Sequence, residues 1–176
     1  MNPNFRTATH EAAHAVTCCF LLGKMKGCVV FDSGGGICID KPADAKVEML
    51  TDVLPAKQGA ILYGRRDVST RDLLNECIMY AAGYVAAELL LGEPGATLYE
   101  DNGDSRTIAA NFLGCYPDAS EDEQIAFLSL VNVMTRPIIR KYEKYIRLVA
   151  AELSQKKILT ADEVVVAMFP GRVTLT

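Results

Sequence analysis

The chain is poor in histidine and has no excess of positive charge. It contains two histidines among 176 residues, and its 18 lysines and arginines against 22 acidic residues give a net charge of -4. A nucleic-acid-binding domain needs a basic surface, so the composition argues against a nucleic-acid partner. We find no apolar run of the length expected to span a membrane, and the polar start is unlike a signal peptide. We therefore expect a cytoplasmic protein whose residues 1–176 form a single domain with a buried core.

Paired cysteine motifs are also missing. The six cysteines form no C-x-x-C pair and lie scattered through apolar segments. This distribution is typical of reduced, buried thiols in a cytosolic protein. Cys28 and Cys38 flank a glycine-rich turn, so a disulfide across a hairpin is the alternative for this pair.

The apolar residues recur mostly at helical spacing, which predicts a mainly α fold. Helix caps support several boundaries: Asn2-Pro3 and Gly23 at the ends of the first helix, Ser120 with Glu123, and Thr160 with Glu163. We place a kink or a new helix start at Pro137. The helices expected on these grounds cover residues 3–22, 70–91, 105–113, 120–134, 137–155 and 160–168, with weaker signals at 47–54 and 58–63.

One segment changes from helical to alternating periodicity. Two short β-branched runs, 28–31 and 37–39, flank a run of glycines at 34–36. This pattern predicts a β-hairpin directly after the first helix. The run Ile37–Ile39 is then either a plain core strand or an exposed edge to which an extended peptide adds by backbone hydrogen bonds.

Both histidines belong to one motif, His10-Glu11-Ala12-Ala13-His14, inside the first expected helix. Residues i and i+4 are about 40° apart around a helix and about 6 Å apart along it, so both imidazoles can share one metal ion. Glu11, the next residue around the helix, can reach a water on that ion. The H-E-x-x-H spacing thus predicts a zinc peptidase site with His10 and His14 as ligands and Glu11 as general base.

A catalytic zinc ion takes three protein ligands and keeps a fourth position for water. No third histidine exists, so the remaining ligand must be a carboxylate or a cysteine. The acidic candidates are Glu88, Asp101 and Asp104. Glu88 can equally hydrogen-bond a ligand histidine or form an ordinary ion pair, and Asp104 can also serve as a helix N-cap. Cys18 and Cys19 do not share a helix face with both histidines.

Four stretches of the chain resemble the peptidase domain of FtsH-type ATP-dependent zinc metalloproteases. They occur in that family's order, which gives weight to pieces that are individually short. His10 to Val16 is similar to the family's H-E-A-G-H-A motif, and Ala82 to Leu89 with Gly92-Glu93 resembles its A-G-R-A-A-E-E-L…G-E helix. Asp104, which precedes Thr107-Ile108-Ala109, resembles the aspartate before the family's A-T-x-I-A helix. Leu153 to Glu163 resembles the family's L…L-x-x-x-E-V ending.

The chain also departs from this family. Ala13 replaces a glycine, Tyr84 an arginine and Ala87 the first of two glutamates, and the loop before Asp104 differs, which keeps Asp101 open as a ligand. The phosphate-binding motif G-x-x-x-x-G-K-[ST] of the ATPase module does not occur in these residues.

The resemblance implies a helical, zincin-like peptidase domain with a small β-hairpin or sheet next to the motif helix. Zn²⁺ would be held by His10, His14 and Asp104, and Glu11 would act on a zinc-bound water to hydrolyse unfolded or flexible polypeptides without ATP. The alternative is a zinc-binding or metal-free interaction module, or an adaptor of a protease, that lacks activity. A homo-oligomer and a separate partner protein both remain open.

Overall fold

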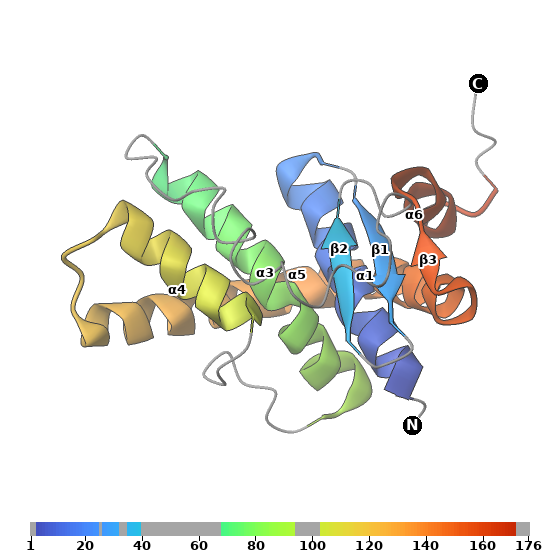
Figure 1. Cartoon of the computed structure of the whole chain (residues 1–176), viewed down its shortest axis with the longest axis horizontal. Coiled ribbons are helices and arrows are strands. Elements are labelled where there is room, and N and C mark those ends of the chain that lie inside the picture. The colour runs from blue at the N-terminus through green and yellow to red at the C-terminus, as the bar shows by residue number, and fades with distance from the viewer. Residues whose placement is uncertain (1–2, 25, 32–34, 40–67, 94–102, 172–176) are drawn as a thin grey trace.

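The computed structural model describes residues 3–24, 26–31, 35–39, 68–93 and 103–171. The weaker helix predictions at 47–54 and 58–63, and the ligand candidate Asp101, lie outside these residues. The described part is mainly helical with one small antiparallel sheet, as the sequence predicts (Figure 1). Its elements are α1 (Pro3–Leu22), β1 (Gly27–Val30), β2 (Gly36–Ile39), α3 (Thr70–Leu91), α4 (Gly103–Cys115), α5 (Glu121–Lys156), β3 (Ile158–Leu159) and α6 (Ala161–Met168).

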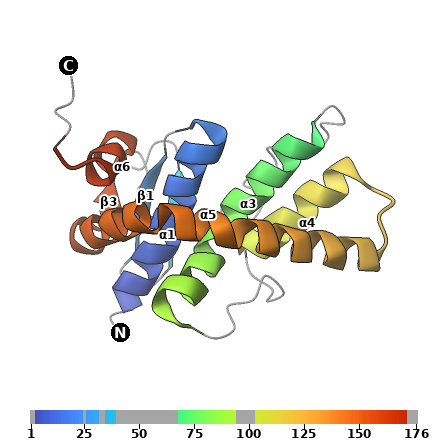
Figure 2. The ribbon, with the colours of Figure 1, turned by 180° about the vertical axis from the view of Figure 1, so that it is seen from behind.

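The motif helix α1 lies at the centre of the fold. It packs against the helices α3 and α5, and another of its sides packs against the β1–β2 hairpin (Figures 1 and 2). Small side chains at Ala8, Ala12 and Ala15 are buried in this core, as are Ala82 and Ala86 of α3. Because these residues are small, the helix backbones approach closely. The histidines of α1 are therefore carried by a helix that is held on several sides.

The sheet contains the predicted hairpin and one strand that the sequence did not indicate. β1 pairs with β2 antiparallel, with Cys28 opposite Cys38, and all six cysteines are free thiols. On its other side β1 pairs with β3, which is only two residues long and carries no periodic signal. The strand order β2-β1-β3 leaves β2 at an edge of the sheet among the described strands.

Of the two alternatives at Pro137, the new helix start, with separate helices at 120–134 and 137–155, was wrong. α5 continues without a break from Glu121 to Lys156. A proline removes one helical hydrogen bond, here the bond to the Val133 carbonyl. Thr135 and Ile139, on either side of Pro137 in the sequence, are both fully buried, so packing holds the two halves in one helix.

Both predicted capping boxes form, whereas the predicted cap Asn2 lies outside the described residues. Ser120 Oγ accepts a hydrogen bond from the Glu123 backbone N–H, and the Glu123 carboxylate accepts one from the Ser120 N–H, which completes a capping box. Thr160 and Glu163 form the same pair of bonds at α6. α3 ends at Gly92, whose φ of 68° is in the left-handed region that glycine favours.

α3 is long and apolar enough to cross a membrane by length and composition alone, contrary to what we expect from the sequence. More than half of its most apolar window is buried inside the fold. A core helix passes the same test, so this property is weak evidence for a membrane span.

Candidate metal centre

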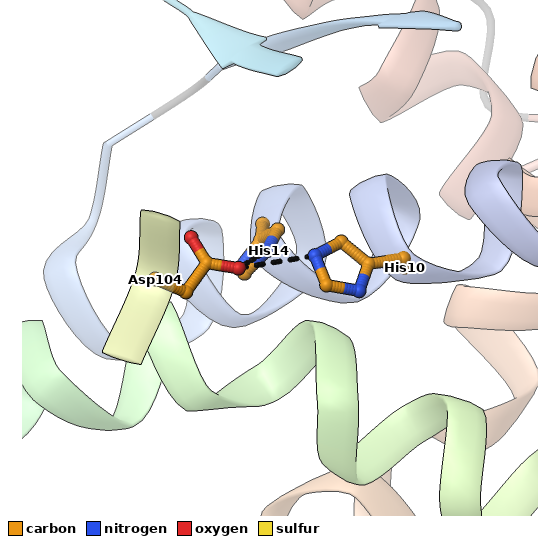
Figure 3. Close-up of side chains that lie close together, drawn as sticks. All are labelled: His10, His14 and Asp104. Atoms are coloured by element: carbon orange, nitrogen blue, oxygen red, sulfur yellow. Dashed lines mark hydrogen bonds and ion pairs between the residues drawn. The ribbon is translucent and has the colours of Figure 1, made fainter. Parts of the chain in front are cut away.

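The structure brings His10, His14 and Asp104 together (Figure 3). The histidines lie one turn apart on α1, and Asp104 lies in the first turn of α4. The Asp104 Oδ2 atom is 3.1 Å from His10 Nε2 and 3.3 Å from His14 Nε2. One ligand atom from each residue lies within 4.8 Å of the other two. The third-ligand candidate favoured from the sequence therefore converges with both histidines.

The two distances from Asp104 Oδ2 fit a tetrahedral zinc ion. Zinc binds nitrogen and oxygen at about 2.0–2.2 Å, so two neighbouring ligand atoms of a tetrahedral site are about 3.4 Å apart. The distances from Asp104 Oδ2 to the two histidine nitrogens are close to this value. Two imidazoles and one carboxylate are also a donor set that zinc prefers, and they leave the fourth position to water.

The orientation of His14 is set by α3. Its Nδ1 donates a hydrogen bond to the backbone carbonyl oxygen of Met79 at 2.7 Å. A carbonyl only accepts, so the proton is on Nδ1, and in the neutral ring the lone pair is on Nε2, which faces Asp104. Ligand histidines in metal sites are commonly fixed in this way.

His10 is held by two residues of α3. The ring of Tyr84 packs edge-on against the imidazole, with ring centroids 4.9 Å apart and an interplanar angle of 88°. Beside it, Gly83 has no side chain where a Cβ would come within 2.5 Å of the His10 ring. α3 therefore positions both histidines of α1.

Glu11 is buried against β2. Glu11 is 5% exposed. If Gly36 of β2 carried a Cβ, this atom would lie 2.6 Å from Glu11 Cγ and 2.9 Å from Glu11 Oε1. Burial raises the pKa of the Glu11 carboxyl above its ordinary value, and the nearby histidines only partly offset this effect. A carboxylate with a raised pKa is a stronger base.

Without a metal ion, Asp104 and His14 act as an ion pair. Burial opposes charge on His14, but the Asp104 charge and hydrogen bond, with a contribution from Glu11, raise its pKa to about 10. Burial likewise opposes charge on Asp104, but the histidines lower the pKa of its carboxyl well below the ordinary value. The His14 proton thus neutralises the Asp104 charge, and a cation that binds here must take the place of that proton.

The other candidates lie differently. Glu88 pairs with Arg136 at 2.9 Å, so of its two interpretations the ion pair is the one observed. Asp104 is in the first turn of α4, which begins at Gly103, and its carboxylate points to the histidines. Among the described residues the metal-ligating cluster contains no cysteine, as expected for Cys18 and Cys19.

Sequence reasoning missed the residues that support the site. The Met79 carbonyl is a backbone group and leaves no trace in the sequence. Gly83 belongs to the stretch that resembles the protease family, and a glycine inside a strongly helical pattern is itself a signal of close packing. Gly36 was interpreted only as part of a turn, although its missing side chain makes room for Glu11.

Comparisons of the chain with protein-family models and with curated proteins find no match.

Proposed function

We propose that this chain is a zinc-dependent peptidase with a zincin-like site of the FtsH type. The observation that supports the proposal best is the convergence of His10 Nε2, His14 Nε2 and Asp104 Oδ2 beside the buried carboxyl of Glu11. Metal ligands alone would suit a storage or structural site. A buried carboxyl on the same helix, with its pKa raised by burial, adds the base that hydrolysis requires.

A bound zinc ion would polarise the scissile carbonyl and make a water molecule acidic enough to attack near neutral pH. His10, His14 and Asp104 would hold the ion, and the Asp104 carboxylate would offset part of its charge. Glu11 would accept the proton of the attacking water and deliver it to the leaving amine. The Met79 carbonyl and Gly83 would hold the imidazoles of His14 and His10 in position during the reaction.

The sheet supports a polypeptide substrate. Among the described strands β2 has one neighbour, β1, and its first residue, Gly36, touches Glu11. An extended polypeptide that adds to the other edge of β2 would run close to the general base. Such binding requires an unfolded or flexible segment, because a folded substrate has no free backbone to offer.

The second candidate is a metal-binding or metal-free interaction module without activity. In such a module the contact between Asp104 of α4 and His14 of α1 would serve to hold the two helices together. The two functions differ in the fourth zinc position. A peptidase leaves that position open, so a small peptide hydroxamate should bind the zinc-loaded protein and raise its melting temperature. With a closed structural site, the hydroxamate should leave the melting temperature unchanged.

The decisive experiment is digestion of unfolded, fluorescently labelled casein by the zinc-loaded protein, with Glu11→Gln alongside. We expect Glu11→Gln to retain zinc but to lose about 100-fold or more of the rate, the usual contribution of a general base. Glu88→Gln is the matched control, because it makes the same chemical change at a carboxylate paired with Arg136. Cleavage by Glu11→Gln at the parental rate would refute the assignment of the base. No cleavage by any protein, with zinc bound, would favour the interaction module.

A further inference from the structure

α5 has a long exposed face that carries large apolar side chains. Val133 is 64% exposed and Leu130 is 48% exposed, and Ala126 and Pro137 are exposed on the same side. From behind, α5 crosses in front of α1, α3 and α4 (Figure 2). Its opposite side, with Val131, Thr135 and Ile139, forms part of the core. Exposed apolar residues that gather on one helix face commonly mark an interaction site.

Charge along this face changes sign from one end to the other. Asp122 precedes the apolar stretch, and Arg140 and Lys144 follow it, all three at exposed positions. Asp122 and Lys144 each lie eleven residues from Val133. Eleven residues are about three helical turns, so the three residues form one line along α5, with the charges about 16 Å on either side of Val133.

An acidic end, an apolar middle and a basic end make a surface that is complementary to its own antiparallel copy. A two-fold axis through Val133 would place Asp122 of each copy opposite Lys144 of the other, and Ala126 opposite Arg140. The closed symmetry of a homodimer requires this self-complementarity, because the same patch must serve both subunits. A parallel arrangement would instead face like charges against each other.

We propose that α5 is the interface of a homodimer in which two copies of this chain pack antiparallel about Val133. The apolar residues supply the buried centre, and the two Asp122–Lys144 pairs set the direction and register. The sheet lies on the opposite side of α1 from α5, so the dimer leaves β2 uncovered (Figures 1 and 2). This inference does not depend on peptidase activity.

Sedimentation velocity of the full chain at about 100 µM tests the proposal, a concentration at which a standard-size interface is populated. We expect twice the chain mass of 19.1 kDa. Val133→Asp places two like charges at the axis and should give a monomer. Val166→Asp, at a 47% exposed apolar position on α6, is the matched control and should remain dimeric. Circular dichroism confirms that each variant is folded.

Charge exchange tests the register. Asp122→Lys and Lys144→Asp should each raise the dimer dissociation constant about tenfold, equivalent to about 1.4 kcal/mol. The double variant should return it toward the parental value, because opposite charges again face each other across the axis. A monomeric parent, a dimer that Val133→Asp leaves intact, or a double variant no tighter than the single ones would each overturn the proposal.

Discussion

The imidazole of His10 rests against the backbone of Gly83. An added Cβ at Gly83 would lie 2.5 Å from both Cε1 and Nε2 of the ring, and real Cβ atoms do not approach that closely. Nε2 is the same atom that lies 3.1 Å from Asp104 Oδ2. The smallest residue of α3 therefore sets where the first ligand of the metal centre can be.

Gly83→Ala should displace His10 and weaken zinc binding. The helix itself gains about 0.5–1 kcal/mol from this change, so any loss of stability would come from the clash with His10. We expect a fall of about 10–100-fold in zinc affinity, the usual cost of disturbing a residue that orients a ligand. Competition with a chromophoric chelator measures the affinity, and circular dichroism checks the fold. Parental affinity in Gly83→Ala would show that this contact does not position His10.

Asp104→Ala should remove the third ligand. The loss of zinc affinity should be at least as large as the roughly 10–100-fold caused by losing a group that only orients a ligand. Asp101→Ala is the control, since Asp101 is the alternative that the sequence leaves open. Zinc content after dialysis against a weak chelator distinguishes the two. Zinc loss in Asp101→Ala with retention in Asp104→Ala would reverse the assignment.

Zinc binding should release a proton and strengthen as pH rises. In the metal-free protein burial lowers the pKa of His14, but Asp104 outweighs burial and raises it to about 10. His14 is then protonated throughout the neutral range, and the ion must displace that proton from Nε2. Affinity should increase about tenfold for each pH unit between 6 and 9. Calorimetric titration in two buffers of different ionisation enthalpy counts the protons. Binding without proton release would contradict the ion pair.

Glu88→Gln should leave zinc binding unchanged. Glu88 accepts a hydrogen bond from Arg136 at 2.9 Å, while the partner of His14 Nδ1 is the Met79 carbonyl. Both side chains of the pair are partly exposed, so removing it should cost no more than about 1 kcal/mol of the free energy of unfolding. Chemical denaturation and zinc affinity together provide the check. A large loss of zinc affinity would mean that Glu88 orients a ligand after all.

The helices and caps of this chain could be predicted because their signals are local. The bounds of α1 and α3 were predicted to the residue, and the capping boxes at Ser120 and Thr160 form as expected. Pro137 misled the prediction because the local preference to end a helix is outweighed by the burial of Thr135 and Ile139. The two-residue strand β3 could not be predicted, because its formation depends on β1, more than a hundred residues earlier.

The candidate site divides in the same way. The sequence alone determined that His10 and His14 share one side of a helix and that Glu11 lies next to them, since three residues of one helix turn are related by helix geometry. Only the tertiary structure decided that Asp104 contacts both histidines, from which it is separated by 94 and 90 positions in the sequence. The tertiary structure also decided that the Met79 carbonyl orients His14 and that Glu88 forms an ion pair with Arg136. These relationships depend on how α3, α4 and α5 pack around α1, and packing joins residues that no local pattern connects.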